Sequence, residues 1–158
     1  MQSMNTDLSF PINSFSSEST EQIAEQIGRR LRGGELIVLE SDLGGGKTTF
    51  TRGLARGAGS KDVISSPTFT ISNIYETPKN KIHHFDFYRL NDPGLITYEL
   101  SEATDDRNSI VIIEWANIIA NVLPANIIKV KIHHQEGDNR HIDISYPKSH
   151  EYLIVDLT

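Results

Sequence analysis

The feature that most constrains the fold is a glycine-rich segment, Ser41–Thr49, which reads Ser-Asp-Leu-Gly-Gly-Gly-Lys-Thr-Thr. A continuous apolar run at 36–39 precedes it and predicts a strand buried on both faces. Residues 47–58 predict a helix, which a pair of glycines ends. Strand, turn and helix in this order match the phosphate-binding loop, Gly, four residues, Gly-Lys-Ser/Thr, with Ser41 in place of the first Gly. The segment therefore predicts an α/β fold with a nucleotide site.

The residue types in this loop suit the chemistry of phosphate. A helix N-terminus offers unpaired N–H groups and a positive dipole end, and glycines let successive N–H groups converge on an anion. Lys47 would reach the β- and γ-phosphates of ATP, and the Thr48 hydroxyl would hold Mg²⁺. The expected nucleotide-binding residues of the loop are Leu43, Gly44, Gly45, Gly46, Lys47, Thr48 and Thr49.

Two carboxylates are candidates for the metal and for catalysis. Glu114 follows a second buried apolar run, 110–113, and ligands of open α/β sheets gather at the carboxyl ends of such strands. We predict that Glu114 binds the metal together with Thr48; the alternative is a surface ion pair. Asp86 ends the strand-like run 82–85 and would be a second metal ligand or orient the attacking water, unless it only bonds a nearby loop. Asp86 and Lys47 are the candidate catalytic residues.

Other polar and aromatic positions carry weaker signals. Thr68 follows Ser66-Pro67, and its hydroxyl would sense the γ-phosphate as a switch loop does, or simply belong to a turn. Arg89 would stabilise transferring charge or brace the surface. Strand alternation predicts that Trp115 faces away from Glu114, toward the core or a partner. The same alternation separates adjacent histidines, as in His83-His84, so we predict no histidine metal site.

The predicted architecture is one α/β domain over residues 1–158, a P-loop NTPase-like sheet with parallel and antiparallel strands, flanked by helices. Residues 1–18 are expected to be a loosely ordered lead-in, and a helix is expected to begin near Ser19 or Thr20. The other expected elements are a hairpin of 68–75 and 81–88, a short helix opening at 91–93, a short helix at 117–123, a hairpin of 127–133 and 140–146, and a strand or tail at 152–157.

Composition excludes several classes of protein. The absence of cysteine excludes disulfides, zinc thiolate sites, iron–sulfur clusters and thiol catalysis. The net charge of −6 argues against a chain that holds nucleic acid on its own by neutralising phosphates. No apolar run approaches the length of a membrane span, and the first ten residues do not resemble a signal peptide. A cytoplasmic domain with no membrane partner is expected.

Four motifs in order resemble one family. They are Asp42-Leu43-Gly44 with Lys47-Thr48-Thr49, Ser66-Pro67-Thr68-Phe69-Thr70, His84-Phe85-Asp86-Phe87-Tyr88-Arg89-Leu90 and Glu114-Trp115. Together they are similar to the TsaE (YjeE) family of bacterial ATPases, over residues from about 20 to 124. That family usually has Gly where Ser41 stands and Ala where Gly45 stands.

The resemblance implies a function and a division of roles. It implies ATP and Mg²⁺ as cofactors, with Thr48 and Glu114 on the metal, Lys47 and the loop amides on the phosphates, Asp86 in hydrolysis and Thr68 in a switch-like loop. It implies protein partners resembling TsaB and TsaD, and tRNA reached only through that complex, where threonylcarbamoyl adenosine is made.

Three other functions compete with an ATPase of a tRNA-modifying complex. A small-molecule kinase needs a lid with arginines over the phosphates, but Arg140 is the only arginine after Glu114. A GTPase needs Asn-Lys-x-Asp, and the nearest match, at 80–83, has His in place of Asp. A non-catalytic nucleotide-sensing module stays open, because sequence alone does not separate it from an ATPase.

Overall fold

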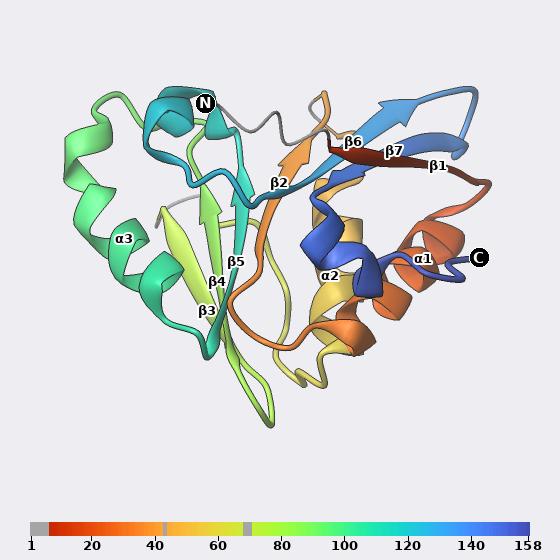
Figure 1. Cartoon of the computed structure of the whole chain (residues 1–158). Coiled ribbons are helices and arrows are strands. Elements are labelled where there is room, and N and C mark those ends of the chain that lie inside the picture. The colour runs from red at the N-terminus through yellow and green to blue at the C-terminus, as the bar shows by residue number, and fades with distance from the viewer. Residues whose placement is uncertain (1–6, 43, 68–70) are drawn as a thin grey trace, which may run out of the picture.

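A seven-stranded sheet forms the centre of the computed structural model, which describes residues 7–42, 44–67 and 71–158 (Figure 1). The strands lie in the order β1-β7-β6-β2-β5-β4-β3. Their bounds are β1 Leu8–Ser14, β2 Leu36–Glu40, β3 Ser72–Glu76, β4 Lys81–Asp86, β5 Ser109–Glu114, β6 Ile128–His134 and β7 Arg140–Tyr146.

The four central strands run parallel and the outer pairs antiparallel. β2 pairs in parallel with β5 and β6, and β4 pairs in parallel with β5, so the carboxyl ends of β2, β4 and β5 lie at one edge of the sheet, the upper edge in Figure 1. β1, β7 and β3 are antiparallel to their neighbours. In register, Glu114 lies beside Leu39 on one side and beside Asp86 on the other. The register therefore places both candidate carboxylates next to the strand that leads into the glycine-rich loop.

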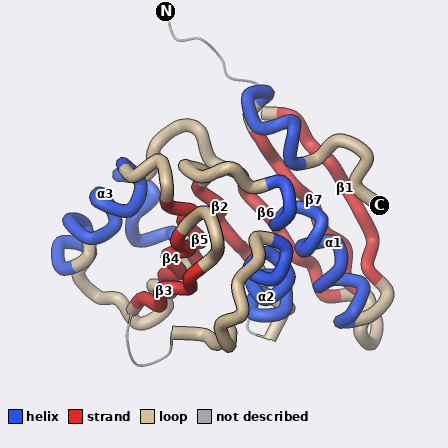
Figure 2. Tube along the Cα trace, turned by 90° about the horizontal axis from the view of Figure 1, so that it is seen from below, coloured by secondary structure: helices blue, strands red, loops and turns tan. Residues whose placement is uncertain are grey.

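Helices cover both faces of the central strands, with α1 and α2 on one face and α3 on the other (Figure 2). The helices are α1 Ser17–Arg30, α2 Lys47–Gly57 and α3 Thr97–Asp105, and the 3₁₀ helices are η1 Pro93–Leu95, η2 Ala116–Val122 and η3 Lys148–Leu153. The predicted mixed α/β sheet flanked by helices is confirmed. In the described part of the chain, no helix is long and apolar enough to cross a membrane.

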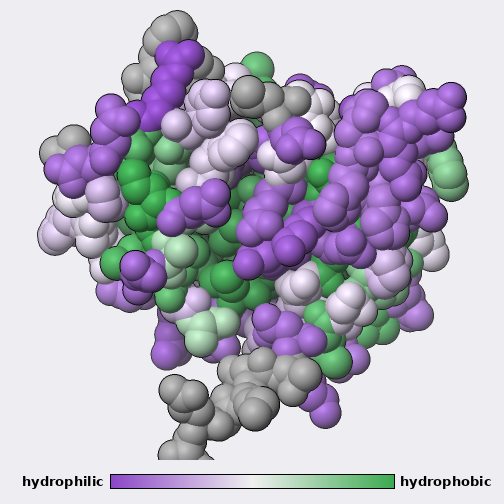
Figure 3. All heavy atoms as spheres, turned by 90° about the horizontal axis from the view of Figure 1, so that it is seen from above, coloured by the Kyte–Doolittle hydropathy of each residue, from purple (hydrophilic) through white to green (hydrophobic). Residues whose placement is uncertain are grey.

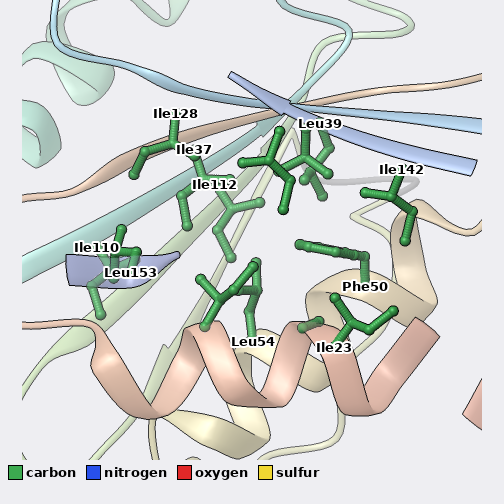
Figure 4. Close-up of a cluster of buried hydrophobic side chains, with 14 of the residues drawn as sticks. Ile23, Ile37, Leu39, Phe50, Leu54, Ile110, Ile112, Ile128, Ile142 and Leu153 are labelled. Carbon is green, nitrogen blue, oxygen red and sulfur yellow. The ribbon is translucent and has the colours of Figure 1, made fainter. Parts of the chain in front are cut away.

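Side chains of β2 alternate between the two helical layers. Ile37 and Leu39 point into a cluster with Phe50 and Leu54 of α2 (Figure 4). Leu36 and Val38 join a second cluster, which includes residues of α3 and η2. Covering on both faces explains why residues 36–39 form an uninterrupted apolar run.

On one side of the sheet, no helix of the described residues covers β6, β7 and β1, and that face is polar. Lys129, Lys131 and His133 of β6 alternate with the buried Val130 and Ile132. In Figure 3 hydrophilic side chains cover the right-hand side, where these strands lie in Figure 1. This half of the sheet follows the alternation of an antiparallel sheet with one wet face.

The expectation of a loose lead-in over residues 1–18 is wrong for its second half. Leu8–Ser14 forms β1, an edge strand paired with all of β7. Helix α1 then begins at Ser17, because the Ser16 hydroxyl caps it by accepting a hydrogen bond from Ser19 N at 3.0 Å. At the other end of the chain, where a strand or tail was expected at 152–157, η3 ends at Leu153 and no strand follows it.

Three glycines allow α1 and α2 to pack with their backbones in contact. A Cβ on Gly57 would overlap the carbonyl oxygen of Glu25, and one on Gly53 would overlap that of Glu21. A Cβ on Gly28 would overlap the carbonyl oxygen of Leu54. These contacts fix the distance between the backbones of α1 and α2. They thereby fix the position of α2, whose N-terminus follows the glycine-rich loop.

We predict that Gly57→Ala destabilises the protein by about 1–3 kcal/mol, because the added methyl group overpacks the helix contact. Helix propensity alone would stabilise the variant by about 1 kcal/mol. Chemical unfolding measures the difference, with the exposed Ser101→Ala in α3 as a control expected within about 0.5 kcal/mol of wild type. A more stable Gly57→Ala protein would contradict the close packing.

Candidate functional site

A cleft of about 290 Å³ opens at the carboxyl ends of β2, β4 and β5. It brings together most of the residues that the sequence analysis singled out. Its lining residues are Gly44, Gly45, Gly46, Lys47, Thr48, Thr49, Ser66, Asp86, Glu114 and Trp115. Two of the expected contacts, Leu43 and Thr68, lie outside the described residues.

The glycine-rich loop exposes backbone donors at the start of α2. Gly44 and Gly46 have left-handed backbone angles, with φ of 75° and 107°, which glycine adopts without strain. Gly46 caps α2 and has no side chain to occupy the first-turn N–H groups. The N–H groups of Lys47, Thr48 and Thr49 find no acceptor within the described ranges. The loop thus presents the unpaired donors and the dipole end that an anion needs.

The Lys47 ammonium lies inside this loop without a carboxylate partner. Only 7% of Lys47 is exposed. Its Nζ donates to Ser41 O at 3.3 Å, Ser41 Oγ at 3.2 Å and Asp42 O at 3.3 Å. No ion pair joins Lys47 to a carboxylate in the described part of the chain. A buried cation held only by dipoles is an energetic cost that a bound anion would relieve.

Ser41 and Gly45 constrain each other sterically. A Cβ on Gly45 would overlap Ser41 Oγ and would lie 2.8 Å from Ser41 Cβ and 2.9 Å from the Asp42 carbonyl oxygen. Ser41 Oγ itself donates to the Asp42 carbonyl oxygen at 2.8 Å and accepts from Lys47. A serine at position 41 therefore requires a residue without a Cβ at position 45.

Thr48 and Glu114 offer oxygen ligands of the kind that Mg²⁺ prefers. Both line the cleft, and the Thr48 hydroxyl makes no hydrogen bond to another described residue. The Glu114 side chain is 3% exposed; its Oε2 lies 2.7 Å from His84 Nε2. Its second oxygen, Oε1, has no hydrogen-bond partner among the described residues and remains for a ligand. The residues present fit a magnesium ion at this position.

Asp86 lies beside Glu114 and is half-buried. Its Oδ1 accepts from Tyr88 N at 3.0 Å, and its Oδ2 accepts from Ser66 Oγ at 3.2 Å. Burial raises the pKa of the Asp86 carboxyl above its ordinary value, and the two hydrogen bonds oppose the shift. Asp86 is therefore fixed in place at the cleft. Arg89, the weaker candidate, is exposed and makes no hydrogen bond or ion pair with the rest of the described chain.

The prediction that Trp115 faces away from the site is wrong. Strand β5 ends at Glu114, and Trp115 has a left-handed backbone with φ of 57°, so alternation no longer applies. The indole lies with Lys47 Nζ 4.7 Å from its ring centroid, and the Tyr88 ring packs against it at 4.8 Å. A bulky residue with positive φ is rare, and such strain is frequent at functional sites.

Two residues at the site carry no signal in the sequence that we recognised. His84 is fully buried and contacts Glu114, a role as a carboxylate partner that strand alternation does not reveal. Arg140 begins β7, and its Nε donates to Gly45 O at 3.2 Å across 95 positions of sequence. The predicted hairpin of β6 and β7 was the available signal, because it returns the chain to the edge where the loop lies.

The comparison with family models settles the family. Residues 14–142 match the model described as threonylcarbamoyl adenosine biosynthesis protein TsaE. The chain belongs to the TsaE family. The match includes β2, the loop, Asp86, Glu114 and the start of β7, so the family pattern spans the whole cleft.

Named relatives and a solved structure agree with this assignment. The chain is 34% identical to the TsaE protein of Rickettsia prowazekii over 79% of this chain and 87% of that protein. It is 35% identical to the TsaE protein of Bacillus subtilis over 79% of this chain and 78% of that protein. It is also similar to the crystal structure of Bacillus subtilis YdiB, with a TM-score of 0.78, 29% identity and coverage of 96% and 95% of the two chains.

We predict that Gly45→Ala weakens ATP binding at least about tenfold and that Ser41→Gly in the same chain restores part of it. The single change forces the new methyl group against Ser41 and the Asp42 carbonyl oxygen, and the second change removes the Ser41 side chain from this contact. Ser41→Gly alone keeps the loop open and should bind ATP at least as well as wild type, because Lys47 loses a competing acceptor. Equal losses in the single and double variants, measured by calorimetric titration, would contradict the coupling.

Proposed function

We propose that the chain is a Mg²⁺-dependent ATPase that acts with partners resembling TsaB and TsaD in the threonylcarbamoyl adenosine modification of tRNA. The observation that carries the proposal is the buried Lys47 ammonium, which lies at the N-terminus of α2 without a carboxylate partner. A triphosphate supplies the missing negative charge, and Glu114 and Thr48 stand beside it with free oxygens suited to a metal.

The residues of the cleft divide the work of hydrolysis between them. Lys47 and the N–H groups of the first turn of α2 bind and orient the phosphates. Thr48 and Glu114 would hold Mg²⁺, whose charge offsets that of the phosphate oxygens. Asp86, fixed by Ser66 and by the Tyr88 amide, would orient the attacking water. Trp115 covers Lys47 and limits the access of solvent to the ammonium.

The pathway and partners in this proposal rest on the family. The matched relatives are named for tRNA threonylcarbamoyladenosine biosynthesis. The net charge of −6 suits a subunit that docks on protein and reaches tRNA only through the complex. We propose that ATP hydrolysis by the chain drives a conformational step of that complex.

An assay of ATP hydrolysis, run with and without the partner proteins, distinguishes the competing functions. A small-molecule kinase would transfer the phosphate to a metabolite and would not need protein partners. A nucleotide-sensing module would bind ATP without turnover under any condition. An ATPase of the modification complex hydrolyses ATP, and its rate rises when TsaB and TsaD homologues are added.

We predict that replacing each carboxylate by an amide has a different effect on ATP binding and turnover. Glu114→Gln weakens the Mg²⁺-dependent part of ATP binding, because an amide is a poorer metal ligand than a carboxylate. Asp86→Asn leaves ATP affinity within about twofold of wild type and lowers turnover about a hundredfold, the usual effect of losing a positioned base. Equilibrium titration with and without Mg²⁺, and phosphate release with both partners present, measure the two effects. Normal hydrolysis by both variants would contradict the assignment.

A further inference from the structure

A line of hydrogen bonds runs from the cleft through the protein interior to the segment before Pro67. It begins at Glu114 Oε2, which lies 2.7 Å from His84 Nε2. His84 Nδ1 lies 3.0 Å from the Tyr75 hydroxyl, and this hydroxyl donates to Ser65 O at 2.8 Å. The three side chains come from β5, β4 and β3, which are neighbours in the sheet.

Both nitrogens of the His84 imidazole have a partner along this line. Burial raises the pKa of the Tyr75 hydroxyl, which therefore keeps its single proton. The Tyr75 hydroxyl donates to Ser65 O and also lies within hydrogen-bond distance of His84 Nδ1, where the donor depends on the histidine tautomer. The imidazole is thus fastened at both nitrogens, and His84 is fully buried.

This geometry sets the orientation of Glu114. A buried carboxylate on a strand end can rotate about its side-chain bonds unless one oxygen is held. His84 holds Oε2, and the backbone register fixes His84 in turn, since it lies opposite Ile112 of β5 and Asn73 of β3. Oε1 is then the oxygen left to a ligand in the cleft. Outer partners of this kind orient metal ligands and tune their affinity.

The second carboxylate of the cleft reaches the same place in the chain by another route. Asp86 Oδ2 accepts from the hydroxyl of Ser66, the residue that follows Ser65. Ser65 O also accepts from Asn73 Nδ2 at 3.2 Å. Glu114 and Asp86 therefore converge on two consecutive residues, one through His84 and Tyr75 and the other directly.

We propose that His84 and Tyr75 are positioning residues that aim the Glu114 carboxylate at the metal and tie its position to the 60–67 segment. The inference rests on the proposed function, because it concerns the metal-linked part of nucleotide binding. A ligand that draws Glu114 toward the phosphates pulls on His84, then on Tyr75, and so on the Ser65 carbonyl. The 60–67 segment thereby responds to the metal through bonds that lie outside the cleft.

Tyr75→Phe tests the proposal, because it removes one hydroxyl and leaves the ring in place. The titration uses a non-hydrolysable ATP analogue, adenosine 5′-(β,γ-imido)triphosphate, once with Mg²⁺ and once with chelator. We expect affinity without Mg²⁺ to stay within about twofold of wild type, and the gain in affinity on adding Mg²⁺ to fall about fivefold or more. Hydrogen exchange of the 60–67 segment should slow with Mg²⁺ in wild type, and this Mg²⁺-dependent slowing should be lost in Tyr75→Phe.

Two further variants separate positioning from stability. Tyr152→Phe is the control: it removes a hydroxyl that donates to another buried carboxylate, Glu35, and neither residue lines the cleft. This variant should leave the Mg²⁺ effect unchanged. His84→Gln keeps a nitrogen donor near Glu114 and should retain more of the Mg²⁺ effect than His84→Leu.

The outcomes distinguish the two proposals. A full Mg²⁺ effect on both affinity and exchange in Tyr75→Phe would overturn this inference and leave the proposed function standing. Equal losses with and without Mg²⁺ would also overturn it, because they would show a role in stability alone. Absence of analogue binding by wild type under both conditions would overturn the proposed function and this inference with it.

Discussion

The buried positive charge of Lys47 is the constraint on which the rest of the site depends. An ammonium removed from water needs compensation, and here three oxygens of Ser41 and Asp42 and the face of Trp115 supply it without a full negative charge. The parallel pairing of β2, β5 and β4 adds Glu114 and Asp86 at the same edge, beside the lysine but not bonded to it. A cation and two acids kept apart in one cleft suit a ligand that carries both phosphate and metal.

The scaffold holds this arrangement by packing on both sides of the loop. On one side the glycines of α1 and α2 fix the depth of the helix whose N-terminus faces the cleft. On the other side Arg140 reaches across from the β6–β7 hairpin and bonds the Gly45 carbonyl. Beneath the cleft, His84 holds Glu114 from inside the sheet. The loop thus gains its shape from distant elements as well as from its own glycines.

Local patterns predicted the parts of the fold that local physics decides. The apolar run of β2, the glycines before α2 and the buried run ending at Glu114 each act through neighbouring residues, so the sequence shows them. Strand β1 was missed although Leu8, Phe10 and Ile12 alternate with polar residues and Pro11, because a proline argues against a strand and the partner, β7, lies at the far end of the chain. The positions of Trp115 and His84 in the site were not predicted, for two different reasons. A positive φ reverses the side that alternation predicts for Trp115, and the partner of His84 lies on another strand.

The emission of Trp115 tests the central claim most directly, because this single tryptophan lies over Lys47. ATP is titrated into wild type and into Lys47→Ala with Mg²⁺ present, and circular dichroism checks that the variant is folded. The account predicts a saturable change in the emission of wild type and none in Lys47→Ala over the same concentrations. An unchanged response in a folded Lys47→Ala protein would mean that the nucleotide binds elsewhere and would contradict the account.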